Sequence, residues 1–160
     1  MPVERYTHVG ICVSDLDRSL HFYREALGFE ELGRLDMKGK TLDQLNQLEG
    51  VKVRTAFLGR DASRLELIEF QAPGWVGPQA ARPMNQVGLT HLAFRVADLD
   101  AVCAKIEAAG GSLIPETRME HPGPIRVIMT LDPDGLRVEL VERPGPVDAV
   151  PGGDGYAMKR

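Results

Sequence analysis

The sequence predicts an α+β fold built from two tandem copies of one βαβββ module. Two observations support it: an internal repeat, and the same order of strand-like and helix-like segments in both copies. A length of 160 residues with 43% hydrophobic residues is enough for one core or two closely packed small ones. We divide the chain into a first module at 4–70, a linker at 71–87, a second module at 88–142 and a Pro/Gly-rich tail at 143–160, which we expect to be flexible.

The repeat is visible as an ungapped alignment of His8–Asp17 with His91–Asp100, at a constant offset of 83 positions. Later in each copy, Arg64–Glu69 aligns with Arg137–Glu142, now at an offset of 73. The shorter offset means that the first copy carries about ten extra residues, which we place between Met37 and Glu49.

Periodicity assigns the elements within each copy. Apolar residues alternate with His8, Gly10 and Cys12, and the same period-two pattern follows His91, so both stretches are predicted strands. Helical spacing then predicts helices, with Asp98 as one N-cap and Ser14 or Asp15 as the other. The predicted helices span 15–27 and 98–109 and end at Gly28 and Gly110, the remaining strands span 29–37, 51–58, 65–70, 112–117, 126–131 and 136–141, and Asp132-Pro-Asp-Gly135 is a hairpin turn.

Charge and composition exclude several classes of protein. The net charge is -4, and the 19 basic residues are mixed with the 23 acidic ones, which argues against a nucleic-acid partner. The N-terminus has no secretory signal and no run approaches the roughly 20 apolar residues of a membrane span. We therefore expect a cytoplasmic protein with no membrane partner. Cys12 and Cys103 are too few and too far apart for a disulfide framework and are expected to be buried free thiols.

The chemistry is predicted by the residues that occupy equivalent points of the two copies. A histidine opens the first strand of each copy (His8, His91), and a glutamate lies within the last (Glu66, Glu139). A glutamate flanked by apolar residues faces a large desolvation cost, which coordination of a cation offsets. Two imidazoles and two carboxylates suit a divalent Zn, Ni, Co, Mn or Fe ion with room for water. A single strand histidine is more often an ordinary core or surface residue, and it is the coincidence at four repeat positions that predicts one metal site.

Other polar and aromatic residues receive weaker assignments. Arg95 lies on the His91 face of its strand, where it is expected to bind an anionic substrate or to form a salt bridge with a glutamate. Glu69 and Glu142, on the opposite pleat from Glu66 and Glu139, are expected to be solvated. His21 and His121 lack repeat partners and are expected in surface or loop positions. Phe57, Phe70 and Met129 are candidates for lining a substrate pocket, with core packing as the alternative.

Several motifs together resemble the vicinal oxygen chelate superfamily, over about residues 4 to 142. They are the run from His8 to Phe29, Leu65-Glu-Leu-Ile-Glu69, Thr90-His-Leu-Ala-Phe94, and Asp132-Pro-Asp-Gly135 followed by Val138-Glu-Leu140. The resemblance implies paired βαβββ modules whose sheets curl into a cup around the metal, in a homodimer. It also implies a small-molecule substrate whose neighbouring oxygens chelate that metal.

The full set of two histidines and two glutamates resembles the glyoxalase I and methylmalonyl-CoA epimerase branch. Three positions depart from these relatives: Cys12 replaces the arginine expected to hold a glutathione carboxylate, Phe70 replaces an asparagine, and Val53 replaces the acidic residue of some epimerases. The resemblance therefore does not settle the substrate.

We expect a metal-dependent lyase or isomerase that acts on a small carbonyl-containing substrate through a metal-stabilised enolate. Glu139, and alternatively Glu66, is the expected base. Two alternatives stay open: an extradiol-type Fe(II) dioxygenase that uses three of the four ligands, and a small-molecule-binding resistance protein. The sequence also leaves open whether the modules pair within one chain or between two.

Overall fold

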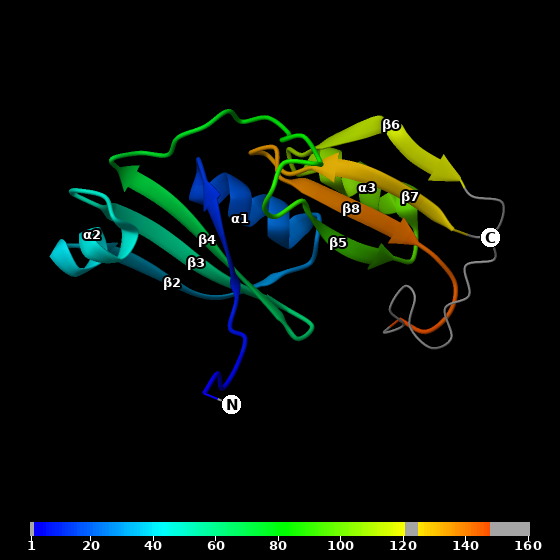
Figure 1. Ribbon diagram of the computed structural model, residues 1–160. Helices are drawn as coiled ribbons and strands as arrows, with labels where there is room; N and C mark the ends of the chain where they lie inside the picture. The colour runs from blue at the N-terminus through cyan, green and yellow to red at the C-terminus, as the bar shows by residue number, and fades with distance from the viewer. Residues whose placement is uncertain (1, 121–124, 148–160) are drawn as a thin grey trace.

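The computed structural model describes residues 2–120 and 125–147, which form two modules side by side (Figure 1). The elements of the first module are β1 (Val9–Val13), α1 (Leu16–Glu25), β2 (Glu30–Lys38), α2 (Lys40–Asn46), β3 (Lys52–Arg60) and β4 (Ser63–Ala72). Those of the second are β5 (His91–Val96), α3 (Leu99–Ala108), β6 (Ser112–Glu120), β7 (Arg126–Leu131) and β8 (Arg137–Glu142).

Each module has its own four-stranded mixed sheet, with strand orders β1-β4-β3-β2 and β5-β8-β7-β6. The first strand of each module runs parallel to the last, and the other neighbours are antiparallel. The two topologies are identical, which confirms the predicted α+β fold of two βαβββ modules. The parallel register pairs Gly10 with Glu66 and Ala93 with Glu139, so the first and last strands present the predicted site residues on one face.

The helices begin and end where local chemistry dictates. Asp15 accepts a hydrogen bond from the backbone N–H of Arg18 at 3.0 Å, and Asp98 accepts one from Ala101 at the same distance. Asp15 is therefore the N-cap of α1 rather than Ser14. Gly28 and Gly110 follow the helices with positive φ angles, which glycine adopts without steric cost.

The extra residues of the first copy form α2, which the sequence patterns do not predict. This helix has seven residues, follows Gly39 without a side-chain cap, and ends at Gln47 in the left-handed conformation. Its residues are not fully buried, so it lacks the continuous apolar stripe by which a helix is recognised in a sequence. Asp43 of α2 accepts a hydrogen bond from the Val51 backbone at 2.7 Å and so holds the helix to the start of β3.

One hydrophobic core serves both modules. The buried cluster includes Leu20 and Leu67 from the first module and Ile106 and Leu140 from the second. Phe29 meets Phe94 across the boundary in an edge-to-face contact, with ring centroids 6.0 Å apart. The two modules therefore bury their apolar residues in one shared cluster.

A polar junction also joins the modules, at the turn between β7 and β8. Asp134 accepts hydrogen bonds from the Ser14 backbone at 3.0 Å and hydroxyl at 2.6 Å, from Arg18 at 2.6 Å and from Gln79 at 2.9 Å. Beside it, the buried Tyr23 hydroxyl donates to Asp132 at 3.0 Å. Gly135 has a φ of 87°, as the predicted hairpin turn requires. The turn therefore docks onto the start of α1.

Two expectations are wrong. Cys12 is exposed, not buried, because β1 alternates and Cys12 falls on the open face of the sheet. Glu69 and Glu142 are largely covered and ion-paired rather than solvated. Glu69 binds Arg54 at 3.2 Å, while Glu142 binds Arg126 at 3.2 Å and accepts the first backbone N–H of α3 at 2.7 Å.

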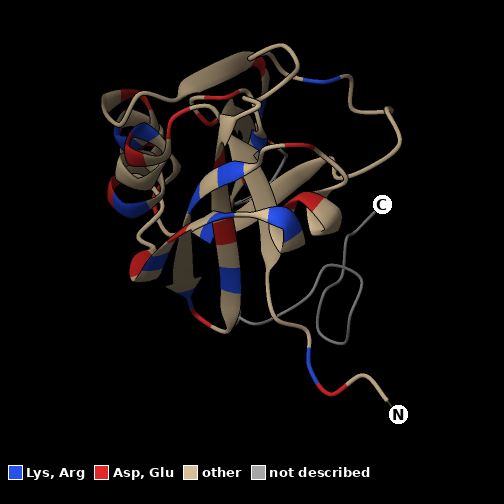
Figure 2. Cartoon of the chain, turned by 90° about the vertical axis from the view of Figure 1, so that its left-hand side faces the viewer, with Lys and Arg blue, Asp and Glu red and all other residues tan. Residues whose placement is uncertain are grey.

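Charges of both signs are interspersed over the helices and strands in the view of Figure 2, as the composition predicts. No helix in the described ranges is long and apolar enough to cross a membrane. The predictions for His121 and for the tail beyond residue 147 fall outside the described residues.

Candidate metal centre

In the first module, the structure brings His8 and Glu66 together. The Nε2 atom of His8 lies 3.1 Å from a carboxylate oxygen of Glu66. The histidine precedes β1 directly, and β1 lies beside β4, so neighbouring strands deliver the two side chains to the same face. The Glu66 side chain is 14% exposed and that of His8 is 33% exposed. This is a partly covered pair with an accessible imidazole.

The second module repeats the arrangement with His91 and Glu139. Here Nε2 lies 3.5 Å from the carboxylate oxygen, and the two side chains are 27% and 26% exposed. The parallel pairing of β5 with β8 again sets the geometry. The second pair is thus looser than the first, and its carboxylate is more open to solvent.

A hydroxyl group holds the far side of each imidazole ring. Thr7 Oγ1 lies 3.0 Å from Nδ1 of His8, and Thr90 Oγ1 lies 3.0 Å from Nδ1 of His91. These contacts leave Nε2 of each ring directed at its glutamate. Neither threonine is among the residues that the sequence predicts for the site, although the repeat offset of 83 relates them as it relates the histidines.

The predicted apolar residues lie on the same faces. The Phe57 ring meets His8 edge-on, with centroids 5.5 Å apart, and is paired in register with Glu66. Phe70 follows Glu66 by four positions on β4 and therefore shares its face. In the second module, Met129 is the register partner of Glu139. Both pairs therefore have apolar neighbours, which limit the access of water.

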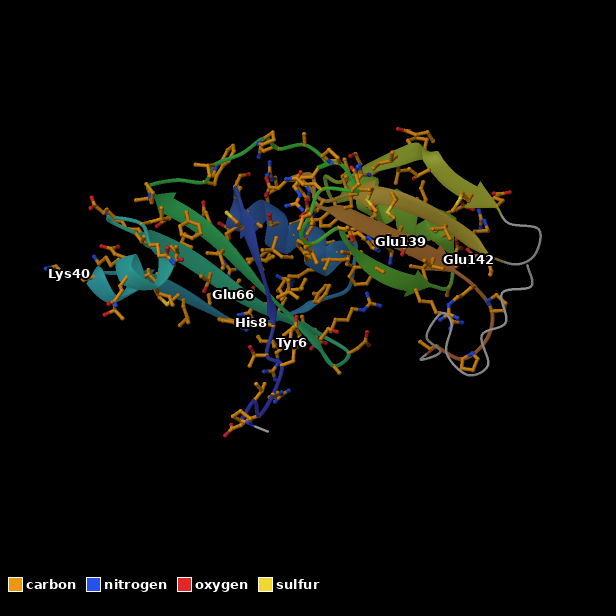
Figure 3. The ribbon with its side chains drawn as sticks, in the orientation of Figure 1. Tyr6, His8, Lys40, Glu66, Glu139 and Glu142 are labelled. Atoms are coloured by element: carbon orange, nitrogen blue, oxygen red, sulfur yellow. The ribbon has the colours of Figure 1, made fainter. Side chains whose placement is uncertain are left out.

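The four predicted ligands form two pairs rather than one cluster within a single chain. Among residues 2–120 and 125–147, no group of three or more metal-binding side chains occurs. Figure 3 shows His8 and Glu66 together on the first sheet and Glu139 on the second sheet. The donor types still fit a borderline divalent cation, because each pair offers an imidazole nitrogen beside a carboxylate oxygen.

In this chain Arg95 contacts loop carbonyls rather than a glutamate, and its role in binding an anionic substrate stays a prediction. Its guanidinium donates hydrogen bonds to the backbone carbonyls of Arg143 at 2.8 Å, Gly145 at 2.6 Å and Pro146. It therefore fastens the segment after β8 to the end of β5. A single sequence could not predict this contact, because backbone carbonyls of a loop leave no residue-type signal.

One hollow in the described part of the molecule lies away from both pairs. It has a volume of about 820 Å³ and lies between the modules, where the end of α1, Arg60, Phe94 and Lys105 line it. Neither His8 and Glu66 nor His91 and Glu139 line it. The imidazole and carboxylate groups that fit a divalent cation therefore lie at the two pairs and not in this hollow.

Comparison with known proteins places the chain in a class. The sequence profile of the Glyoxalase/Bleomycin resistance protein/Dioxygenase superfamily matches residues 5–140, and the chain belongs to this superfamily. Among curated proteins, the probable lactoylglutathione lyase of Vibrio cholerae is 32% identical over 143 residues, which cover 89% of this chain and 93% of that protein. The lactoylglutathione lyase of Haemophilus influenzae is 29% identical over 136 residues, covering 84% and 90% respectively.

Solved structures agree with this placement. A glyoxalase family protein from Bacillus cereus superposes with a TM-score of 0.78 at 25% identity, over 89% of this chain and 96% of that one. The glyoxalase I of Leishmania major, described as trypanothione-dependent, gives a TM-score of 0.59 at 26% identity, with coverage of 88% and 87%. The chain is therefore similar to glyoxalase-type enzymes in both sequence and fold.

Proposed function

We propose that two copies of this chain build two metal sites, each from His8 and Glu66 of one copy and His91 and Glu139 of the other, and that the assembly is a metal-dependent lyase or isomerase. The observation that carries the proposal is the pair of half-sites. Each half-site has one imidazole and one carboxylate, and a catalytic metal in a protein usually has three or more protein ligands. In a two-fold symmetric dimer, each half-site of one copy would meet the other half-site of its partner, so two complete sites would form.

The half-sites are suited to such a meeting. Both half-sites lie on open sheet faces. Their four side chains are between 14% and 33% exposed, so a second chain can reach them. Each histidine already has its Nε2 beside a carboxylate, so two such pairs supply the four ligands without rearranging their own modules. We propose Zn, Ni, Co, Mn or Fe as the metal, because imidazole and carboxylate donors suit these ions.

A bound divalent cation would stabilise negative charge on a substrate carbonyl oxygen and so acidify the neighbouring carbon. Glu139 then takes the proton from that carbon and returns it to a neighbouring position or face. Glu139 is the better base of the two glutamates, because its contact with histidine is longer and its side chain is more exposed than that of Glu66. Phe57 and Phe70 limit water beside the reacting atoms.

The substrate class follows from the relatives' names and from this chain's own residues. We propose a small carbonyl compound, with a thiol adduct of a 2-oxoaldehyde as the first to test, because the relatives are lactoylglutathione lyases. Arg95 is a weak candidate for binding the substrate's anionic group, since loop carbonyls already accept three of its hydrogen bonds. Substrate binding therefore rests mainly on Phe57 and Phe70.

Complementation between two inactive variants tests the shared site. One variant carries His8→Ala and Glu66→Ala, and the other carries His91→Ala and Glu139→Ala. In a mixed dimer, one site receives all four substitutions and the other receives none. Random pairing should therefore restore about a quarter of the wild-type zinc stoichiometry and activity, whereas each variant alone has none.

If the four ligands meet within one chain, mixing restores nothing, and the proposed assembly is wrong. Exchange of the substrate's carbon-bound proton with deuterated water tests the reaction class separately. Iron in the purified protein together with oxygen uptake would instead place it with the dioxygenases.

A further inference from the structure

We propose that Thr7 and Thr90 are positioning residues that let His8 and His91 change ring tautomer when the metal binds, without losing the hydrogen bond at Nδ1. The inference rests on the proposed metal site and assigns a role to two residues outside its ligand set. The observation is the same contact made twice: a threonine hydroxyl lies 3.0 Å from Nδ1 of each of these histidines.

Each ring is held at both nitrogens. Nδ1 faces the hydroxyl, and Nε2 faces Glu66 at 3.1 Å or Glu139 at 3.5 Å. His21, the other histidine within the described ranges, has neither contact and lies exposed on α1. The two-sided arrangement therefore distinguishes the proposed ligands from an ordinary surface histidine.

The two states of the site need opposite protonation patterns. In a neutral imidazole without metal, a proton on Nε2 would let this nitrogen donate a hydrogen bond to the carboxylate, and Nδ1 would then accept one through its lone pair. A bound metal would take the lone pair of Nε2, so the proton of a neutral imidazole would sit on Nδ1 and would be donated from there. Nε2 releases one proton to water and Nδ1 takes one up, so the neutral ring keeps its charge.

A hydroxyl can satisfy both patterns, because it has one donor hydrogen and two acceptor lone pairs. A carbonyl or a carboxylate could serve only the metal-bound state, since neither can donate. Thr7 and Thr90 are exposed, so their hydrogen bonds to histidine contribute little to folding. We therefore assign their effect to the orientation of the imidazole and to metal affinity.

The test compares Thr7→Val/Thr90→Val with Thr7→Ser/Thr90→Ser. Valine keeps the β-branched shape of threonine and removes the hydroxyl, whereas serine keeps the hydroxyl. Zinc affinity is measured by competition with a chromogenic chelator, and the histidine tautomers are read from nitrogen-15 NMR with and without zinc. We expect the valine variant to bind zinc about 10- to 100-fold more weakly, as is usual when the outer partner of a ligand is lost. The serine variant should bind zinc like the wild type.

The tautomers provide a readout that a purely structural role would not change. In the wild type, both rings should carry the proton on Nε2 without zinc and on Nδ1 with zinc. Zinc binding by the valine variant at wild-type strength would overturn the proposal, as would equal weakening in the serine variant. A proton on Nδ1 in the zinc-free wild type would overturn it too. If the wild type binds no divalent metal, both the proposed function and this inference are wrong. If the wild type binds metal but the valine variant binds it equally well, only the role of the threonines is wrong.

Discussion

The two modules share a topology and a pair of site residues but differ in how tightly they hold the pair. His8 and Glu66 are 3.1 Å apart, and Glu66 is 14% exposed, whereas His91 and Glu139 are 3.5 Å apart, and Glu139 is 26% exposed. Both modules therefore have the same two donor groups, but the carboxylate of Glu139 is farther from its histidine and more exposed than that of Glu66. This difference is the reason for proposing Glu139, rather than Glu66, as the base.

The modules differ again in their last turns. The turn between β3 and β4 leaves Asp61 87% exposed, with only a 3.6 Å contact to Arg60. The equivalent turn between β7 and β8 docks onto α1 through Asp134, whose side chain is 13% exposed. The turn of the second module therefore adds a polar contact between the modules, whereas the first module carries an extra helix, α2.

The largest expected effect is on the rate of substrate proton exchange, and it compares substitutions of the two carboxylates, Glu139 and Glu66. Glu139→Gln should lower the rate of substrate proton exchange by about 10²- to 10⁴-fold, because an amide cannot accept the proton. Glu66→Gln should lower it much less, since the amide oxygen can still coordinate a metal. Both rates are measured at saturating zinc, and zinc titration checks that each variant is loaded. A greater loss from Glu66→Gln would move the base to the first module.

The next largest effect is on the free energy of unfolding, and it compares alanine substitutions of two glycines, Gly111 after α3 and Gly28 after α1. A Cβ on Gly111 would lie 2.5 Å from the Phe22 ring and 2.6 Å from the backbone oxygen of Leu131, which cannot move aside. Gly111→Ala should therefore cost about 3 kcal/mol of unfolding free energy by overpacking the boundary between the modules.

Gly28→Ala is the matched control. A Cβ there meets only the flexible Arg60 guanidinium, at 3.3 Å, and its cost comes from a φ of 67°. We expect about 1 kcal/mol for that backbone strain. Urea unfolding measures both variants, and equal losses would mean that the close contact at Gly111 relaxes freely.

The smallest expected effect is the loss of unfolding free energy when Asp134 is substituted, and this loss depends on pH. Burial raises the pKa of this carboxyl, but hydrogen bonds from the Ser14 hydroxyl and backbone outweigh that effect and hold the pKa below its usual value of 3.8. Asp134→Asn should cost about 1 to 2 kcal/mol of unfolding free energy at neutral pH. Asp61→Asn, on the exposed turn, should change it by less than about 0.5 kcal/mol.

The sign of the pH dependence follows from the lowered pKa. The ionised Asp134 contributes its full stability above the ordinary carboxyl pKa and loses it as the pH falls through the lowered folded-state value. The gap between the wild type and Asp134→Asn should therefore close at acid pH. A constant gap between pH 7 and about pH 3 would show that the charge of Asp134 is not what joins the modules.

The sequence predicted the parts of this molecule that depend on repetition and on short-range chemistry. The offset of 83 related the two histidines, and period-two alternation located β1, which follows His8, and β5, which begins at His91. The helix ends followed from Asp98 and Gly28, because caps act within one turn. For the same reason, the hairpin turn before β8 was predictable in its place and its residues.

Features that depend on tertiary register were not predictable. The partners of Glu69 and Glu142 are arginines on neighbouring strands, and naming them requires the cross-strand pairing. Arg95 binds backbone carbonyls, which any residue carries. The division of the four predicted metal ligands into two pairs depends on how whole modules pack, which the sequence pattern does not encode. Thr7 and Thr90 are a different case. The offset of 83 relates them in the sequence, but no pattern indicated that their hydroxyls contact the histidines.

The shared core has a consequence for how the chain tolerates being cut. The linker at 71–87 lies outside the core cluster, and Val87 is 98% exposed. A protease that nicks the backbone near Val87 removes none of the buried contacts, so the two fragments should remain bound to each other. By contrast, either fragment made alone would expose the apolar surface that the other now covers. We therefore expect the chain to tolerate new termini in its linker, as made by circular permutation.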